Sequence, residues 1–335
     1  MQRITPIGRG ALLSLLLAFG LDFQATAQAQ TAARIVFEAV VSAKGTTYSQ
    51  IFSMNPDGSD VTQLTRASAN ALWPRRSPNQ HYIAFFRNGQ LWVMDAIGEA
   101  NGGHSWAVAP ANAGGVDWSP NVLVSPDGTT TTYTLVYTAG GSLYTVSASI
   151  NPSAGTATAS APVLFQSGSW FAPSWSPLDA LGGSKIAANG SANRSADMIV
   201  VFDAGTPGAA PLATFGAVSD QNFDPSWSPD GSQIAFSGRE YVTTTARNGK
   251  TTTTIYLAIF VAVPDYSSGN GVAGISQVTA WTTSTQSFPT WSSNGSTLAF
   301  SGNGNNAIYA VPSTSFMSSS WTLIHSPGNM PDWYP

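Results

Sequence analysis

The sequence predicts an all-β protein, and specifically a β-propeller whose blades each contain four antiparallel strands. The first observation is a repeat: the phrase Pro-x-Trp-Ser-Pro-Asp-Gly, or a degraded copy of it, occurs at spacings of roughly 42 to 64 residues. The second is that short segments with alternating apolar and polar positions separate the copies, with no helical periodicity. The copies begin at Pro74, Val116, Pro173, Pro225, Pro289 and Pro331. A repeat of about this length with strand-like content is typical of a propeller blade.

Each repeat can be divided into strands. Residues 225–228 form a first strand, Pro229-Asp230-Gly231 turns the chain, and residues 233–237 return antiparallel to the first strand. Proline presets the φ angle of the turn and glycine tolerates positive φ. Third strands are expected at 50–54, 90–94, 142–146 and 307–311, and fourth strands at 61–65 and 276–279. The Trp of each copy is expected to fill the wedge between adjacent blades.

The last copy, residues 331–335, stops before its hairpin is complete. The missing half lies at the other end of the sequence, where Arg34-Ile35-Val36-Phe37 matches the Gln-Ile-Ala-Phe of the best copy. Joined, the two ends make one repeat, which indicates a closed ring. We therefore expect Trp333 to be buried, and removal of residues 330–335 to open the ring and destabilise the domain.

Composition indicates a folded, exported protein. The chain has 335 residues, 43% of them apolar and 9% charged, with no Cys and a formal net charge of -4. Residues 1–29 have the basic start, short apolar run and small-residue cleavage site of a secretory signal peptide, and residues 30–335 form one domain. The charge does not favour nucleic acid, and no segment is long enough for a membrane span. A monomer in the periplasm or the medium is expected, stabilised by core packing rather than disulfides.

These repeats resemble the TolB-like, WD40-like (PD40) propeller family, whose consensus is PxWSPDGxxIAF followed by an IYxxD strand and an LT strand. The resemblance covers nearly all of residues 30–335. It implies six blades, with the first strand of each repeat innermost, the C-terminus providing the innermost strand of the closing blade and the N-terminus its other three. A seventh blade would require a weak repeat hidden in residues 129–165. TolB itself carries an additional α/β domain before its propeller, which we do not expect here.

Charged residues stand out on the expected innermost strands. Arg76 occupies the position where the other copies have Trp, and Arg75, Asp117 and Asp332 occupy the position before it in three blades that are adjacent in a closed ring; Asp224 lies two positions further upstream in another blade. Arg76 can be simple drift, with its stem on apolar surface and its charge in water. The group as a whole is either a structural ion cluster or a site at the channel mouth for a ligand or cation.

A second candidate surface is the segment 241–254. It contains Asn248-Gly249 between β-branched residues, which predicts a two-residue hairpin with arms longer than a blade needs. Its tip carries Arg247 and Lys250, which could bind an acidic partner. The alternative is a solvated loop with no partner, and in either case its deletion should leave folding intact.

The sequence offers little for catalysis. His81, His104 and His325 have no metal-ligand spacing, no Gly-x-Ser-x-Gly motif occurs, and Asp57-Gly58-Ser59-Asp60 is explained by a tight turn. We therefore expect no catalytic residue, metal or cofactor, and a non-catalytic module of the cell envelope that binds another protein through the propeller mouth, as the resemblance implies. The alternative is a glycan-active lyase or hydrolase, or a carbohydrate-binding propeller using Trp106, Trp170 and Trp281; two carboxylates around an open cleft would favour the enzyme.

Overall fold

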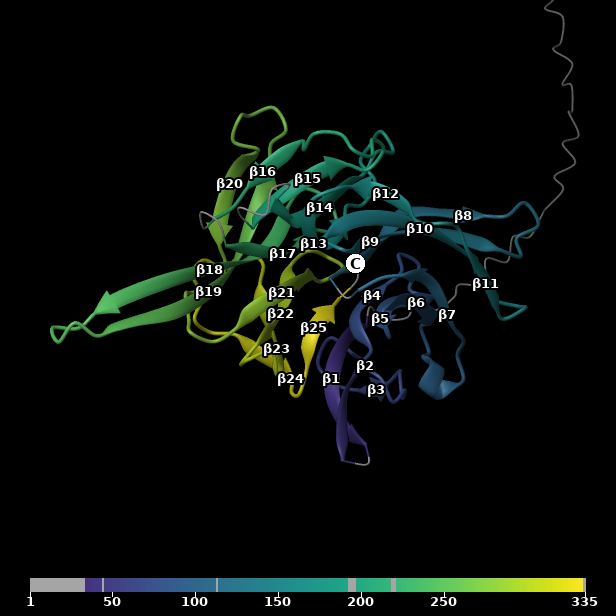
Figure 1. The fold of residues 1–335 in the computed structure, drawn as a ribbon, viewed down its shortest axis with the longest axis horizontal. Helices are drawn as coiled ribbons and strands as arrows, with labels where there is room; N and C mark the ends of the chain where they lie inside the picture. Colours follow the sequence, from purple (N-terminus) through teal and green to yellow (C-terminus); the bar gives the residue numbers. More distant parts are fainter. Residues whose placement is uncertain (1–33, 44, 113, 192–196, 218–220, 334–335) are drawn as a thin grey trace, which may run out of the picture. The chain divides into compact units, whose positions relative to one another are not determined.

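A computed structural model describes residues 34–43, 45–112, 114–191, 197–217 and 221–333, and the expected signal peptide lies outside them. The described chain forms six antiparallel sheets arranged as blades around a central axis, which confirms the six-bladed β-propeller (Figure 1). Five sheets have four strands and one has five. No described helix is long and apolar enough to cross a membrane.

The blades are numbered here in chain order, and the strands of each are given from the inside outwards. Blade 1 contains β25 (Asn329–Asp332), β1 (Ile35–Ala43), β2 (Thr46–Met54) and β3 (Thr62–Gln63), and blade 2 contains β4 (Leu72–Arg76), β5 (Tyr82–Arg87), β6 (Gln90–Asp95) and β7 (Ser105–Pro110). Blade 3 contains β8 (Val116–Val124), β9 (Thr131–Ala139) and β10 (Ser142–Asn151), with both β11 (Thr156–Ala159) and β12 (Val163–Gln166) paired to β10. Blade 4 contains β13 (Ser169–Trp175), β14 (Lys185–Ser191), β15 (Met198–Asp203) and β16 (Ala213–Phe215). Blade 5 contains β17 (Asn222–Trp227), β18 (Ile234–Thr245), β19 (Thr251–Pro264) and β20 (Val272–Gln277), and blade 6 contains β21 (Gln286–Trp291), β22 (Thr297–Gly302), β23 (Ala307–Pro312) and β24 (Thr322–His325).

Apolar side chains from the second and third strands fill the wedges between blades. In the wedge between blades 4 and 5, Ala187 and Ile199 pack with Ile234 and Phe236, all of them buried. Alternating strand positions face opposite sides of a sheet, so each blade contributes one set of side chains to each neighbouring wedge. Trp227 is also part of this cluster, which confirms the wedge position expected for the Trp of the repeat.

Each repeat has a Trp near the end of its innermost strand, or Arg76 in blade 2, and we call this position the Trp slot. Three residues before the Trp slot, every blade has a residue with positive φ. These residues are Trp73, Gly115, Ala172, Asp224, Phe288 and Met330. All but Gly115 precede a proline, and the pairing registers in these blades shift at this point, as in a β-bulge. The amide group of each bulge residue is therefore turned out of the regular strand ladder.

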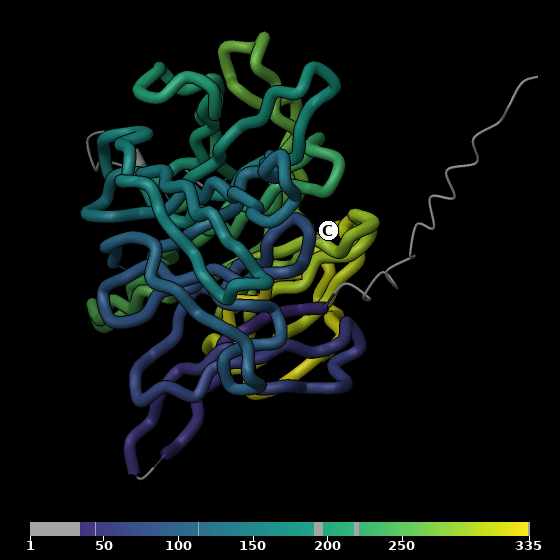
Figure 2. The backbone as a smooth tube through the Cα atoms, turned by 90° about the vertical axis from the view of Figure 1, so that its right-hand side faces the viewer, coloured from purple at the N-terminus to yellow at the C-terminus, as the bar shows by residue number. Residues whose placement is uncertain are grey.

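The ring closes in blade 1, as predicted. β25 pairs antiparallel with β1, with Val36 opposite Asp332 and Glu38 opposite Asn329. Figure 2 shows this N-terminal segment in purple beside the C-terminal segment in yellow. Trp333 was expected to be buried, and it is instead half-buried: it packs against the cluster that contains Ile35, and it lies one residue beyond the end of β25.

The segment 129–165 does not form a seventh blade. Its strands β9 to β12 all belong to blade 3. Blade 3 also departs from the best copy of the repeat, because β8 continues past Pro120 to Val124 and the chain turns at Ser125–Gly128, where the Ser125 carbonyl accepts the Gly128 amide N–H at 2.8 Å.

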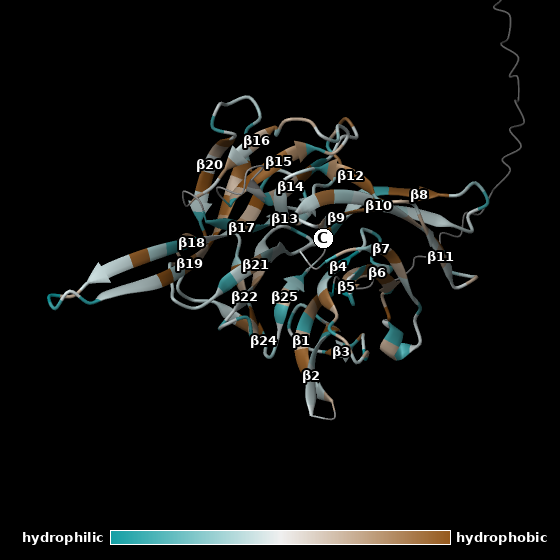
Figure 3. Cartoon of the chain, viewed as in Figure 1, coloured by the Kyte–Doolittle hydropathy of each residue, from teal (hydrophilic) through white to brown (hydrophobic). Residues whose placement is uncertain are grey.

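β18 and β19 extend beyond their blade as a two-stranded ribbon, as predicted for residues 241–254 (Figure 1). Figure 3 shows a hydrophilic tip and hydrophobic residues where the strands enter the blade. The ribbon does not end in a two-residue turn: the last pair is Thr245 with Thr251, and residues 246–250 form a longer loop closed by the Ala246 amide N–H and the Lys250 carbonyl at 2.8 Å.

Candidate functional site at the mouth of the channel

The innermost strands surround a cavity of about 310 Å³ at one end of the channel. Its walls are the Trp, Pro and Ser residues of the repeats, among them Trp175, Pro177 and Ser226. Arg75, Asp117 and Asp332 are the charged residues that line it. The cavity exists because the repeats end their innermost strands at the same height, where the small Ser and Thr side chains leave space between the blades.

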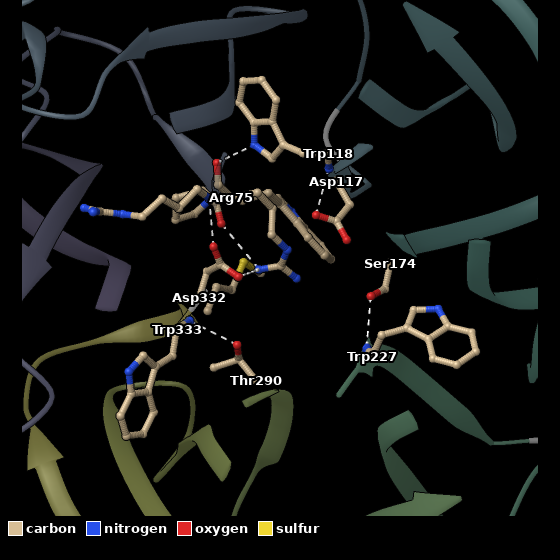
Figure 4. A network of polar contacts seen from close by, with 12 residues as sticks. Arg75, Asp117, Trp118, Ser174, Trp227, Thr290, Asp332 and Trp333 are labelled. Carbon is tan, nitrogen blue, oxygen red and sulfur yellow. Dashed lines mark hydrogen bonds and ion pairs between the residues drawn. The ribbon is translucent and has the colours of Figure 1, made fainter. Parts of the chain in front are cut away.

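The residue before each Trp slot connects its blade to the next one. The carboxylate of Asp332 accepts the amide N–H of Arg76 at 2.8 Å, and that of Asp117 accepts the amide N–H of Trp175 at 2.6 Å. In the same way the hydroxyl oxygens of Ser174 and Thr290 accept the amides of Trp227 at 3.2 Å and Trp333 at 3.0 Å (Figure 4). At the two remaining seams the indole N–H makes the connection, from Trp118 to the carbonyl of Arg75 at 2.9 Å and from Trp291 to that of Ser226 at 3.0 Å.

A deeper layer of contacts holds the bulges. The amide N–H of Trp73 is donated to the carboxylate of Glu38 in the preceding blade. Corresponding contacts run from the amide of Asp224 to Asn189 at 3.3 Å, of Phe288 to Asp224 at 3.3 Å and of Met330 to Ser301 at 2.8 Å. A buried amide N–H without an acceptor would destabilise the folded protein. These side chains therefore stabilise the bulges by accepting the amides that the bulges remove from the strand ladder.

Arg75 lies among four carboxylates. Burial raises the pKa of Asp117 to about 7, that of Glu38 to about 7 and that of Asp224 to about 6, and it raises the pKa of Asp332 as well. In each case the positive charge of Arg75 opposes the shift. The guanidinium Nη1 of Arg75 is 3.9 Å from Oδ1 of Asp332, an ion pair too long to be a hydrogen bond.

Arg76 is only 4% exposed, so the interpretation that its charge lies in water is wrong. It fills the Trp slot between blades 1 and 2, and its Nε has no hydrogen-bond partner among the described residues. Burial lowers its pKa to about 10, Asp332 opposes that shift and Arg34 adds to it. Asp332 accepts the backbone amide of Arg76 and its charge favours the charged guanidinium, so Arg76 is a structural element of this seam.

The predicted group is thus only partly one site. Arg75, Asp117 and Asp332 lie around the cavity, on blades 2, 3 and 1 (Figure 4). Asp224 lies in the deeper layer and does not line the cavity, because its bulge position points away from the mouth. The sequence reasoning did not identify Glu38, although the alignment of Ile35-Val36-Phe37 with the repeat places Glu38 where other blades have Ser237 and Ser301.

Other candidates lie elsewhere. Arg247 and Lys250 are exposed at the ribbon tip and do not line the cavity. Trp170 is buried, and Trp106 and Trp281 pack against core clusters, so these three Trp serve mainly the core. His104 contacts Asp95 at 3.1 Å and stacks on Trp106. No group of three or more His, Cys, Asp or Glu suited to a metal ion occurs within the described ranges.

The fold is similar to solved TolB structures. TolB from Acinetobacter baumannii matches with a TM-score of 0.50 and 15% identity, over 91% of this chain and 67% of that chain. A putative TolB from Agrobacterium tumefaciens matches with a TM-score of 0.51 and 15% identity, over 90% of this chain and 92% of that chain. An oligogalacturonate lyase in complex with manganese has a TM-score of only 0.40 at 12% identity, over 85% of this chain and 72% of that chain.

At these identities the similarity extends to the fold alone. No protein-family model matches the sequence, and no curated protein matches it. The propeller architecture expected from the resemblance is confirmed, whereas membership of the PD40 repeat family stays a prediction.

Proposed function

We propose that this chain is an exported, non-catalytic scaffold that binds another protein at the mouth of its propeller. The observation that carries the proposal is the open cavity together with the turn beside it. Residues 176–184 of blade 4 present Leu178 and Leu181 to solvent, 43% and 97% exposed, next to Pro177 in the cavity wall. Exposed leucines beside a concave, partly aromatic surface are typical of protein interaction sites.

The hydrogen bonds of Asp117 favour binding over catalysis. Both oxygens of Asp117 already accept backbone amides, from Trp118 at 2.8 Å and Trp175 at 2.6 Å. A general acid or base needs an oxygen that can reach the substrate proton. The resemblance to TolB-like propellers and the signal-peptide pattern support a location in the periplasm or outside the cell.

The proposal is tested by placing a photo-crosslinking amino acid at Leu181 and, as a control, at Thr252 on the ribbon. Both positions are exposed. In envelope fractions of the source cells, the Leu181 derivative should form one specific protein adduct that the Thr252 derivative does not form, and Ser226→Phe, which fills the cavity, should reduce it. Adducts that are the same from both positions would contradict the proposal.

One observation favours glycan cleavage as a second candidate. Asp117 and Asp332 line the same cavity, and burial raises the pKa of both. A pair of carboxylates in a cleft is the arrangement that glycosidases use. New reducing ends or unsaturated products from envelope or plant polysaccharides, lost in Asp332→Asn, would establish this activity in place of the scaffold function.

A further inference from the structure

The two edges of the ring carry opposite charge. The mouth edge consists of the turns from the first to the second and from the third to the fourth strand of each blade; the far edge consists of the remaining turns and the connections between blades. Aspartates at the mouth edge are Asp57, Asp60, Asp95, Asp127, Asp179, Asp203, Asp230 and Asp265, and its Arg and Lys residues are Arg34 and Lys185. The far edge carries the basic residues Arg66, Arg239, Arg247 and Lys250, which outnumber its described acidic residues Asp197 and Glu240. Arg87 is buried and is paired with Glu99, which belongs to the mouth edge.

Most of the mouth-edge charge is not neutralised internally. Arg34 pairs with Asp60 and Lys185 with Asp179, whereas no ion pair involves Asp57, Asp127, Asp203, Asp230 or Asp265 within the described part of the chain. Hydrogen bonds from Ser125 and Ser228 lower the pKa of Asp127 and Asp230, so both carboxylates are ionised at neutral pH.

The cavity beside this acidic edge is also lined by a carboxylate, that of Asp332. Asp332 is 8% exposed, and the amide of Arg76 engages its Oδ2. Its Oδ1 receives no hydrogen bond from the described residues and has only the long ion pair with Arg75, at 3.9 Å. Asp332 lines the cavity together with Arg75 and with the Trp and Pro residues of the repeats, and indole and proline walls suit the stem and charge of a Lys or Arg side chain.

We propose that the mouth edge docks a basic polypeptide segment and that the cavity receives one of its Lys or Arg side chains. This inference rests on the proposed function, and it adds the chemical class of the partner. Complementary charge around a recess speeds encounter and selects the partner, so the interaction should weaken steeply with salt. The basic far edge is excluded as the surface for the same segment because it would repel it.

The test uses fluorescein-labelled octa-arginine as the probe and octa-citrulline as its neutral counterpart, with binding followed by fluorescence anisotropy. The probing variant is Asp127→Asn/Asp230→Asn/Asp265→Asn. It should fold, because Asn79 and Asn294 natively hold the turns of blades 2 and 6 that are equivalent to those of Asp127 and Asp230, with contacts such as the amide of Ser296 to Asn294 at 3.0 Å. Asp265 lies in a different turn, where it accepts the amide of Ser267 at 2.9 Å, a contact that an Asn side-chain oxygen can also accept. The matched control, Arg239→Gln/Arg247→Gln/Lys250→Gln, changes three charges on the far edge.

At low salt the octa-arginine affinity of the probing variant should fall about tenfold, while the control should bind at least as tightly as the parent and octa-citrulline should not bind. Equal affinity in the probing variant and the parent would overturn the inference. Parent binding that does not change between 20 and 300 mM NaCl would also overturn it, because the Debye length falls at least about threefold over that range. The salt series needs no variant, so it decides even if the triple variant is unstable. A Leu181 adduct whose yield is lowered neither by salt present during crosslinking nor by the triple variant would leave the scaffold function standing and refute the basic segment.

Discussion

Glu38 gives the sharpest test of the electrostatic account of the seam between blades 1 and 2. The residue is 4% exposed, and burial raises its pKa from 4.5 to about 7 against the opposing effects of the Trp73 amide and Arg75. A folded-state pKa above the unfolded value means that the folded protein binds the proton more tightly. The contribution of Glu38 to stability is therefore fully present below about pH 4.5 and is lost as the pH rises through about 7.

The size of the effect follows from the shift. Raising the pKa from 4.5 to about 7 makes the ionised form less favourable in the folded protein by about 3 kcal/mol. Glu38→Gln keeps an acceptor for the Trp73 amide and removes the charge. The variant should match the parent at pH 4.5 and exceed it at pH 8 by up to about 3 kcal/mol in the free energy of unfolding.

The assay is urea unfolding followed by Trp fluorescence at pH values from 4.5 to 8, with the difference between variant and parent plotted against pH. Asp127→Asn is the control, because Asp127 is exposed and its pKa is lowered, so its difference should be flat over this range. A variant that is less stable than the parent at pH 8 would contradict this prediction, since it would mean that Arg75 stabilises the ionised carboxylate more than burial destabilises it.

Four further outcomes are expected in urea or thermal unfolding. Gly115→Ala should lower the free energy of unfolding by about 3 kcal/mol, because a Cβ there would lie 2.6 Å from a backbone Cα of blade 4. Gly128→Ala is the control: Gly128 also has positive φ but open space around it, so this change should cost only about 1 kcal/mol. Equal losses in the two variants would contradict the predicted clash. Thr290→Val removes the acceptor for the closing strand and should cost about 1 to 2 kcal/mol, with Thr290→Ser restoring it; a silent Val variant would show that the contact is dispensable. Removing residues 330–335 should abolish a single cooperative transition because blade 1 loses its innermost strand, and a truncated chain that melts like the parent would disprove closure at this seam. Deleting residues 244–252 should leave the melting temperature within about 3 °C of the parent, and loss of folding would make the ribbon a structural element.

The repeat allowed much of the architecture to be predicted. Pro225 to Phe236 contains a strand, a turn and a returning strand, so its copies located the innermost strands and the closing seam directly. Local patterns could not predict the burial of Arg76 or the half-exposure of Trp333, because both depend on how closely neighbouring blades approach. The long β8 has a similar origin, since its pairing with β9 extends it past Pro120.

The candidate site was predictable only in part. Arg75, Asp117 and Asp332 share a position in the repeat, and that register placed them together around one cavity. Glu38 lies on a different strand, and its role depends on the amide turned towards it by the bulge at Trp73. Such contacts join strands from separate repeats, and a single sequence does not reveal which side chain faces which amide.

The closing of blade 1 imposes an order in time on folding. β1 is among the first strands to be synthesised and β25 is the last, yet each is the other's neighbour in the sheet. Throughout synthesis β1 has an unpaired edge, and such edges readily pair with other chains. The ring can close only after β25 has been synthesised, so this long-range pairing comes late in folding.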